Sequence, residues 1–168
     1  MFNSSEIRRL IKERQLITGY IDLEIQLQPT GFDLSLRAVQ RYKGGGKVDF
    51  SNLEREIARK ELLEPDTDDW YNLEVGCYTI VYNEVVKIPL DVVAMARSRS
   101  TLLRNGATVQ TAIWDPGYQG RSSSLLVVSN PNGIRLKRDA RLTQLVFFGT
   151  DKVQRGYDGI YQGERMTR

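Results

Sequence analysis

The chain has 168 residues, with 24 basic and 21 acidic side chains, a formal net charge of +3, one cysteine and no histidine. This length fits one domain, expected over residues 1–168, that buries roughly two thirds of the surface its unfolded chain would expose. Without histidine the chain lacks the most common general base, the Ser-His and Cys-His nucleophile pairs, and every histidine-containing metal site. Any catalysis must therefore depend on carboxylate, lysine, tyrosine or metal-bound water.

Cysteine content and apolar runs bear on the cellular compartment. Cys77 cannot form an internal disulfide, and the opening MFNSSEIRRL lacks the apolar core of a signal peptide, so we expect a cytoplasmic protein. No run approaches the length of a membrane span, so no membrane partner is expected. The small net charge is too weak to predict nucleic-acid binding. Basic residues concentrate in RSRSTLLR and from Lys152 to Arg168, which favours a local site for anions.

One amphipathic helix is predicted near the start of the chain, over about residues 4–15. A serine cap precedes Ile7, Leu10 and Ile11, which have helical spacing. The basic face of this helix is expected to be solvated. The run from Tyr20 to Leu27 that follows has the pattern of a strand.

The next segments predict a half-buried strand, an open loop and a surface excursion. In FDLSLRAVQRY apolar residues alternate with polar ones, so one face of the strand is expected to be buried. The stretch from Lys43 to Lys47 is glycine-rich, but Val48 stands where a phosphate loop needs Ser or Thr, so a flexible hairpin loop is favoured. The charged stretch from Ser51 to Trp70 lacks the pattern of a calcium loop. The residues expected on the buried face of the strand are Phe32, Leu34, Leu36 and Ala38.

Short strands separated by turns are predicted from Tyr78 onward. TIVYNEVVKIPL indicates two strands around a Tyr-Asn turn, and Ser100 is expected to cap one helical turn near residues 100–105 that ends at Gly106. Strands that recur at intervals of about ten residues indicate an all-β, mainly antiparallel sandwich or barrel with little helix. The later strands are expected at residues 109–113, 123–128, 133–136 and 142–148.

Three clusters carry residue types that can bind or transform a ligand. From Arg97 to Arg104, arginines lie beside a hydroxyl at a helix N-terminus, which suits phosphate, although a capped surface helix with solvated arginines has the same pattern. Asp115 begins Asp-Pro-Gly-Tyr, the residue order of a type II turn, and a purely local turn would also explain this aspartate. The glycine-rich, aromatic tail from Gly156 to Arg165 is expected either to close over a ligand or to be disordered.

In their order along the chain, these segments resemble the dUTPase and dCTP deaminase superfamily, and most closely its archaeal dUTPase branch. The resemblance begins at Gln28-Pro-Thr-Gly-Phe-Asp33-Leu-Ser-Leu and covers nearly the whole chain. It implies a distorted β-barrel of the β-clip type, and a homotrimer with active sites between neighbouring subunits. The resemblance continues through Lys87-Ile-Pro-Leu, Arg99-Ser-Thr-Leu-Leu-Arg104, Thr111-Ala-Ile-Trp-Asp115-Pro-Gly-Tyr118, Arg141-Leu-Thr-Gln144-Leu and Gly159-Ile-Tyr161-Gln162.

The resemblance also implies roles for individual residues. Asp115 matches the catalytic carboxylate that activates water for attack on the α-phosphate of dUTP, and Tyr118 matches the aromatic that packs under deoxyribose and disfavours a 2′-hydroxyl. Mg²⁺ is the implied cofactor, held mainly by the substrate phosphates rather than by protein ligands. Residues 151–168 match the tail that closes over the active site. The implied substrate-binding residues are Arg99, Ser100, Thr101, Arg104, Gln110, Thr111, Ala112, Tyr118, Gln144, Tyr157, Tyr161 and Gln162.

One position separates the two reactions of this superfamily. The deaminases have a glutamate ten residues beyond the family aspartate, and that position is Leu125 in this chain. Because removal of the exocyclic amine of cytosine needs a proton shuttle, dUTP diphosphatase activity is favoured over dCTP deaminase or bifunctional activity. A non-catalytic nucleotide-binding module is a third alternative, and the retention of Asp115 argues against it. In the tail, Ile160 and Glu164 depart from the lysine and glutamine of many relatives.

Overall fold

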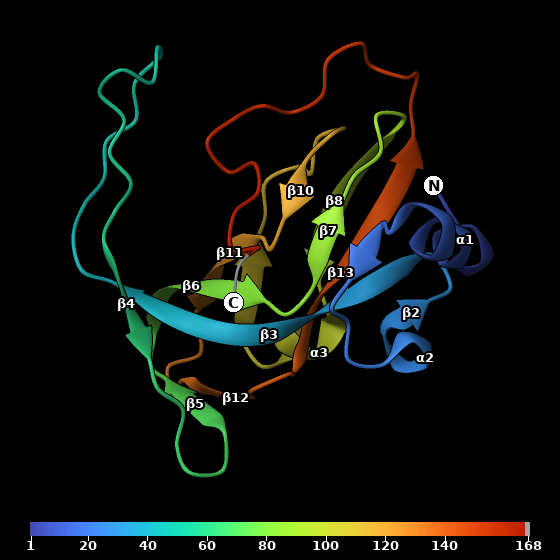
Figure 1. Ribbon diagram of the computed structural model, residues 1–168. Helices are drawn as coiled ribbons and strands as arrows, with labels where there is room; N and C mark the ends of the chain where they lie inside the picture. The colour runs from blue at the N-terminus through green and yellow to red at the C-terminus, as the bar shows by residue number, and fades with distance from the viewer. Residues whose placement is uncertain (167–168) are drawn as a thin grey trace.

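Alternating apolar residues build a strongly bent antiparallel sheet, shown in the computed structural model of Figure 1. The structure describes residues 1–166, so Thr167 and Arg168, the end of the expected tail, lie outside the described residues. No helix of the described part is long and apolar enough to cross a membrane. The elements are α1 (Ser4–Arg14), β1 (Ile17–Thr18), α2 (Leu23–Gln26), β2 (Leu27–Gln28), β3 (Gly31–Tyr42), β4 (Lys60–Leu63), β5 (Trp70–Leu73), β6 (Gly76–Tyr82), β7 (Val85–Lys87), β8 (Val92–Ser98), α3 (Ser100–Arg104), β9 (Ala107–Gln110), β10 (Gln119–Gly120), β11 (Ser123–Val128), β12 (Ile134–Lys137) and β13 (Arg141–Gly149).

The main sheet has the strand order β8-β13-β3-β6-β11-β9, with β2 and β4 also paired to β3, and every ladder in it is antiparallel. Ser98 joins its two ends. The hydroxyl of Ser98 on β8 accepts the backbone N–H of Val109 on β9 at 2.7 Å and donates to the carbonyl of the same residue at 3.2 Å. The sheet therefore curls into a nearly closed barrel, which confirms the predicted fold class.

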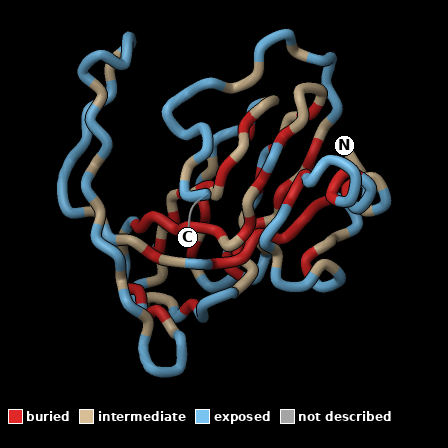
Figure 2. The backbone as a smooth tube through the Cα atoms, viewed as in Figure 1, coloured by how far each residue is buried: buried red, intermediate tan, exposed pale blue. Residues whose placement is uncertain are grey.

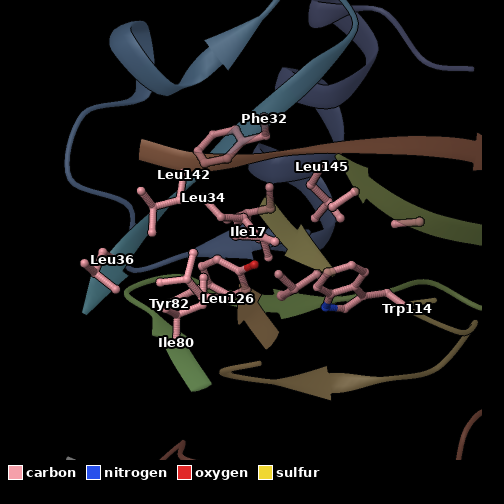
Figure 3. Packing of buried hydrophobic residues seen from close by; sticks show 14 of the residues in the cluster. Ile17, Phe32, Leu34, Leu36, Ile80, Tyr82, Trp114, Leu126, Leu142 and Leu145 are labelled. Atoms are coloured by element: carbon pink, nitrogen blue, oxygen red, sulfur yellow. The ribbon is translucent and has the colours of Figure 1, made fainter. Parts of the chain in front are cut away.

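The interior of the barrel is filled by apolar side chains from strands that are distant in sequence. Figure 3 shows Leu34, Tyr82, Leu126 and Leu145 packed together, with Trp114 at one side of the cluster. None of these five is more than 5% exposed. Figure 2 shows the same division along the backbone, since the strands are largely buried and the long loops are exposed. Removal of this apolar surface from water is the main force that closes the barrel.

The predicted N-terminal helix is present as α1, with one correction at its cap. Ile7, Leu10 and Ile11 are buried as expected. The N-cap is Asn3 rather than a serine, because the Asn3 Oδ1 accepts the backbone N–H of Glu6 at 2.9 Å. Asparagine satisfies a free N–H of the first turn as well as serine does.

The expected strand from Tyr20 to Leu27 is wrong. The carboxylate of Asp22 accepts the backbone N–H groups of Glu24 and Ile25 at 2.9 and 3.0 Å and thereby caps a short helix, α2. Strand pairing begins only at Leu27. The alternation of apolar and polar residues was therefore overridden by a local aspartate cap.

The strand predicted in FDLSLRAVQRY is present as β3, but its buried face changes within the strand. The register with β6 shifts between Leu36 and Ala38, so that Val39 points into the core at 0% exposure and Ala38 is only partly buried. A bulge of this kind reverses which residues face inward beyond it. Phe32, Leu34 and Leu36 are buried as predicted, and Ala38 is not.

The later strands agree with the sequence to within a few residues. The strand predicted at 123–128 is β11, those at 133–136 and 142–148 are β12 and β13, and the helical turn at 100–105 is α3. The strand predicted at 109–113 is β9, which ends earlier, at Gln110. The residues that follow lead into the turn that carries Asp115.

We predict that Tyr82 links stability to alkaline pH. Burial raises the pKa of Tyr82 to about 12, although its hydrogen bonds to Ser124 and Thr143, at 3.0 and 3.1 Å, act in the opposite direction. Its contribution to the free energy of unfolding is therefore complete below about pH 10 and is lost as the pH rises toward 12. Tyr82→Phe should cost about 1–3 kcal/mol at neutral pH, because two buried hydroxyls lose a partner, and should flatten the loss between pH 10 and 12.

Urea unfolding at several pH values measures both effects, with Tyr42→Phe, at the end of β3, as the matched control. Parallel loss of stability in Tyr82→Phe and the wild type above pH 10 would contradict this assignment.

Candidate functional site

Asp115 lies at the first position of a tight turn. The backbone N–H of Tyr118 donates to the carbonyl of Asp115 at 3.1 Å, and Gly117 has a φ of 87°, which confirms the predicted type II turn. A side chain at Gly117 would also place its Cβ 2.7 Å from the Cα of Gly156. The carboxylate of Asp115 is exposed, and within residues 1–166 it makes no ion pair or side-chain hydrogen bond with another residue.

The residue before this turn anchors it to the barrel. Trp114 and Ala94 exchange two backbone hydrogen bonds of 2.9 and 3.0 Å, and the indole N–H of Trp114 donates to Ser122 Oγ at 2.8 Å. Trp114 is 5% exposed. Asp115 therefore projects from a fixed backbone rather than from a mobile loop.

A cavity of about 430 Å³ opens beside Asp115 and is called here the Asp115 cavity. This volume is within the range of small-molecule sites. Four separate segments line it: Ile57 with Lys60, residues 112–115 with Tyr118, the serines at 122–124, and the tail. The arrangement combines aromatic faces with one unpaired carboxylate. Of the predicted site residues, this cavity collects Ala112, Asp115, Tyr118, Tyr157 and Tyr161.

The tail folds back onto the Asp115 turn of its own chain. Figure 1 shows it leaving β13, passing over one end of the barrel and descending beside β10. The N–H of Tyr157 donates to Pro116 O and that of Gly163 to Gln119 O, both at 2.8 Å. The side chain of Gln162 completes the contact by bonding the backbone on both sides of Tyr118. The described part of the tail therefore packs on the Asp115 turn and forms one wall of the cavity.

Glu164 connects this tail to the aromatic side chain of the turn. The hydroxyl of Tyr118 donates to Glu164 Oε1 at 3.0 Å, and the N–H of Arg121 donates to Glu164 O at 2.9 Å. Burial raises the pKa of Tyr118, and the negative charge of Glu164 raises it further. The glutamate that departs from the glutamine of many relatives is thus a direct partner of Tyr118.

Lys60, at the start of β4, brings a cation to the Asp115 cavity. Burial lowers the pKa of Lys60 and the charge of Arg165 lowers it further, while Glu164 acts in the opposite direction. Sequence reasoning missed this residue, because Lys60 lies in a charged stretch that was interpreted as a surface excursion. No local pattern distinguishes it from its neighbours.

A second hollow, called here the arginine groove, has a volume of about 1090 Å³ and lies between α3 and the small sheet β12-β5. Arg99 and Arg141 flank it and share one buried carboxylate: Asp33 Oδ2 lies 2.9 Å from Arg99 Nε and 3.2 Å from Arg141 Nη1. Burial raises the pKa of Asp33, and the two arginines oppose that shift. The pairing fixes both guanidinium groups while leaving N–H donors for an anion.

The candidate phosphate-binding residues from 100 to 104 lie on α3, as expected, but the predicted cap of this helix is wrong. Arg99 is the N-cap residue of α3, and no side-chain hydrogen bond caps this helix, so the expected capping role of Ser100 is wrong. Ser100, Thr101 and Arg104 are exposed, and Thr101 lines the groove. Exposed hydroxyl and guanidinium groups remain available to a ligand.

The two hollows have no lining residue in common. Trp114 pairs with Ala94 on β8, five residues before Arg99, which directly follows that strand. At about 3.3 Å per residue this separates Asp115 from Arg99 by about 17 Å along the barrel wall. Gln110 and Thr111 lie between these ends, and Gln144 on β13 pairs with Arg97 and Asp33 outside both hollows.

Arg141 flanks the arginine groove, and it was not among the binding residues predicted from the sequence. Its Nη1 donates to Ile25 O at 2.7 Å as well as contacting Asp33, so it ties α2 and β3 to the groove. The segment that contains it was noted in the family resemblance, but Gln144 was chosen there instead. Contact with the buried Asp33 marks Arg141 only once the strands are paired.

No cluster of three or more His, Cys, Asp or Glu side chains that could hold a metal ion occurs within residues 1–166. The carboxylates of the Asp115 cavity are Asp115 itself and Glu164, and Glu164 is already paired with Tyr118 and Arg165. A cation at this site would therefore need most of its oxygen ligands from a bound anion and water.

Comparisons with known proteins point to one family. The family model described as dCTP deaminase-like matches residues 1–150. A protein of Archaeoglobus fulgidus named probable deoxyuridine 5'-triphosphate nucleotidohydrolase is 49% identical over 166 residues, covering 99% of this chain and 98% of the relative. A Methanosarcina barkeri protein of the same name is 46% identical over 166 residues, covering 98% and 97%.

A solved structure supports the fold. The 2'-deoxycytidine 5'-triphosphate deaminase from Agrobacterium tumefaciens superposes with a TM-score of 0.62 at 24% sequence identity. The match covers 87% of this chain and 45% of the deaminase, so this chain spans less than half of that protein's length. The shared feature is the distorted barrel.

We predict that Glu164 holds the tail against Tyr118. A hydrogen bond to a charged group contributes about 1.5–3 kcal/mol, so Glu164→Ala should speed hydrogen exchange at the Gly163 amide by roughly tenfold or more. Glu164→Gln keeps an acceptor and should have a smaller effect. Glu13→Ala, which removes an exposed carboxylate from α1, is the control. Unchanged exchange at Gly163 in Glu164→Ala would refute the role.

Proposed function

Because the chain belongs to the dCTP deaminase-like family, and its curated relatives of the same length are named dUTP nucleotidohydrolases, we propose that it is a dUTP diphosphatase. The observation that carries this proposal is the unpaired carboxylate of Asp115 beside a cavity of nucleotide size. A protein that only binds an anionic nucleotide gains nothing from an uncompensated negative charge there. A hydrolase needs one as a general base.

The reaction follows from this placement. The carboxylate of Asp115 accepts a proton from a water molecule, whose oxygen bonds to the α-phosphorus of dUTP. The bond from that phosphorus to the bridging oxygen of the β-phosphate breaks, and pyrophosphate leaves, so that dUMP and pyrophosphate are the products. Tyr118 and Tyr157, whose rings meet edge to face at 5.7 Å, provide the aromatic surface against which the sugar packs.

Complete sites would combine two copies of the chain. Arg99, one of the arginines expected to bind phosphate, borders one hollow and Asp115 borders the other, and the two are about 17 Å apart along β8. A homotrimer, as the family resemblance implies, would bring the arginine groove of one copy to the Asp115 cavity of the next. Such a head-to-tail interface closes into a ring. The guanidinium groups then stabilise charge that develops on the phosphates.

Magnesium fits this site as a substrate-borne ion. The donors present are the exposed Asp115 carboxylate and water, and the triphosphate itself would supply the remaining oxygens. When bound, the ion neutralises phosphate charge. We place the enzyme in the cytoplasm, with the pool of deoxynucleotides on which it acts.

Deamination is disfavoured because this chain has no glutamate at the position where the deaminases have theirs. Leu125 occupies it, in register between Thr79 on β6 and Gln110 on β9. None of these three side chains moves a proton near neutral pH. The neighbouring serines at 123 and 124 do not supply that function either.

We predict that Asp115→Asn lowers kcat for dUTP by a factor on the order of 10²–10⁴, with little change in nucleotide affinity. The amide keeps the size of the side chain but cannot accept a proton from water. Pyrophosphate and ammonia are followed together with dUTP and with dCTP, with and without magnesium. Undiminished turnover in Asp115→Asn would overturn the mechanism, and ammonia from dCTP would revive the deaminase.

We further predict that two inactive variants restore activity when mixed. Asp115→Asn and Arg104→Ala each damage a different half of the site, so subunit exchange between them regenerates some sites with both halves intact. Random mixing in equal amounts should return roughly one quarter of wild-type activity. A mixture no more active than its separate components would show that one chain provides both halves.

A further inference from the structure

A long arm, residues 43–59, projects from the barrel between β3 and β4. Figure 1 shows it extending away from the rest of the chain at the upper left, and Figure 2 shows that it is exposed along most of its length. The sequence predicted a flexible hairpin loop at residues 43–47 and a surface excursion from Ser51 to Trp70. The structure joins the first part of that excursion to the loop as one arm, with about eight residues on each side of the tip and a reach of about 25 Å.

The arm has an internal structure. Lys47 and Glu56 exchange backbone hydrogen bonds of 3.0 and 3.1 Å across it, and their side chains form an ion pair of 2.9 Å. At the tip, the carboxylate of Asp49 accepts the hydroxyl of Ser51 at 2.6 Å and the N–H of Leu53 at 3.1 Å. These contacts close the tip into a defined turn, which limits the entropy lost when it docks.

The tip exposes large apolar side chains to water. Val48 is 93% exposed, Phe50 is fully exposed and Leu53 is 90% exposed, whereas large exposed apolar side chains elsewhere in the described chain reach at most 67%. Burial of such a side chain contributes about 1.5–3 kcal/mol. A cluster of three on one turn is typical of a surface that is covered by a partner.

The base of the arm lies at the proposed active site. Ile57 and Lys60 both line the Asp115 cavity. The arm therefore extends outward from the half-site that, in the proposed function, must meet the arginine groove of a second copy.

The arginine groove has the complementary chemistry. Leu73, Val75, Ile134 and Leu136 contribute apolar lining, and Arg99, Arg135 and Arg141 give its rim more positive than negative charge. The tip from Val48 to Glu54 carries Asp49 and Glu54 and no basic residue. An apolar, acidic tip thus matches an open, apolar, basic groove.

We propose that the arm of one copy inserts its Val48, Phe50 and Leu53 tip into the arginine groove of a second copy of this chain. The contact ties the partner copy to the segment that begins at the Asp115 cavity, so loss of the docked tip should also lower dUTP hydrolysis. The consequence for catalysis rests on the proposed function, but the assembly itself does not.

The test compares full-length variants by sedimentation velocity and by dUTP hydrolysis. Phe50→Ser, and the triple variant Val48→Ser, Phe50→Ser and Leu53→Ser, should weaken self-association by roughly 30-fold or more, as expected for central apolar contacts. The triple variant should sediment as a single chain of 19.2 kDa, with its circular dichroism unchanged. Ile21→Ser removes an exposed apolar side chain outside the arm and groove and should leave the assembly intact.

The outcomes separate the two proposals. A wild type that assembles and a triple variant that does not would support the docking arm, even if the wild type failed to hydrolyse dUTP and the proposed function fell. A triple variant with the wild-type mass, or a monomeric wild type, would overturn the docking arm and leave the activity measurement to stand alone.

A second measurement applies if the triple variant does not fold. Phe50 is replaced by the photoreactive p-benzoylphenylalanine, and isotopically heavy and light chains are mixed before illumination. Cross-links from position 50 of one chain to residues 73–75 or 130–136 of another would support the docking arm. Cross-links within one chain, to other surfaces, or to nothing would overturn it.

Discussion

The pairing of the segment 107–114 with β8 is the constraint on which the site depends. Ser98 binds the backbone of Val109 at one end of this pairing, and Ala94 exchanges two hydrogen bonds with Trp114 at the other. The same contacts close the barrel and set the distance between Arg99 and Asp115. Because the strand cannot shorten, Asp115 and Arg99, which the proposed reaction needs, stay at opposite ends of this pairing within one chain.

This separation explains how the remaining features fit together. Within residues 1–166 the cations of the Asp115 hollow are Lys60 and Arg165, and neither forms an ion pair with Asp115. Arg99 and Arg141, in turn, are held by the buried Asp33, which positions their guanidinium groups in the absence of substrate. Each half is therefore preorganised separately, and in the proposed homotrimer self-association would join them. The tail adds a wall to the Asp115 cavity through Glu164 and Gln162.

Local chemistry made much of the fold predictable, and long-range contacts account for what was missed. The alternation at the start of β3, the strand-like run of β11 and the Asp-Pro-Gly-Tyr turn follow from neighbouring residues alone. The helix α2 was missed because one aspartate cap outweighed an alternating pattern, and Ala38 was misplaced because a bulge depends on the partner strand. Lys60 and Arg141 reach the hollows only through strand pairing, which leaves no signal in their own sequence neighbourhood.

The central claim is that water, activated by Asp115, attacks the α-phosphate of dUTP. Hydrolysis of dUTP by the wild-type protein in water labelled with oxygen-18, followed by mass spectrometry of both products, tests it most directly. The account predicts that the label enters dUMP and is absent from pyrophosphate, because the new bond forms at the α-phosphorus. Label in pyrophosphate would place the attack on the β-phosphate and contradict the assigned position of Asp115.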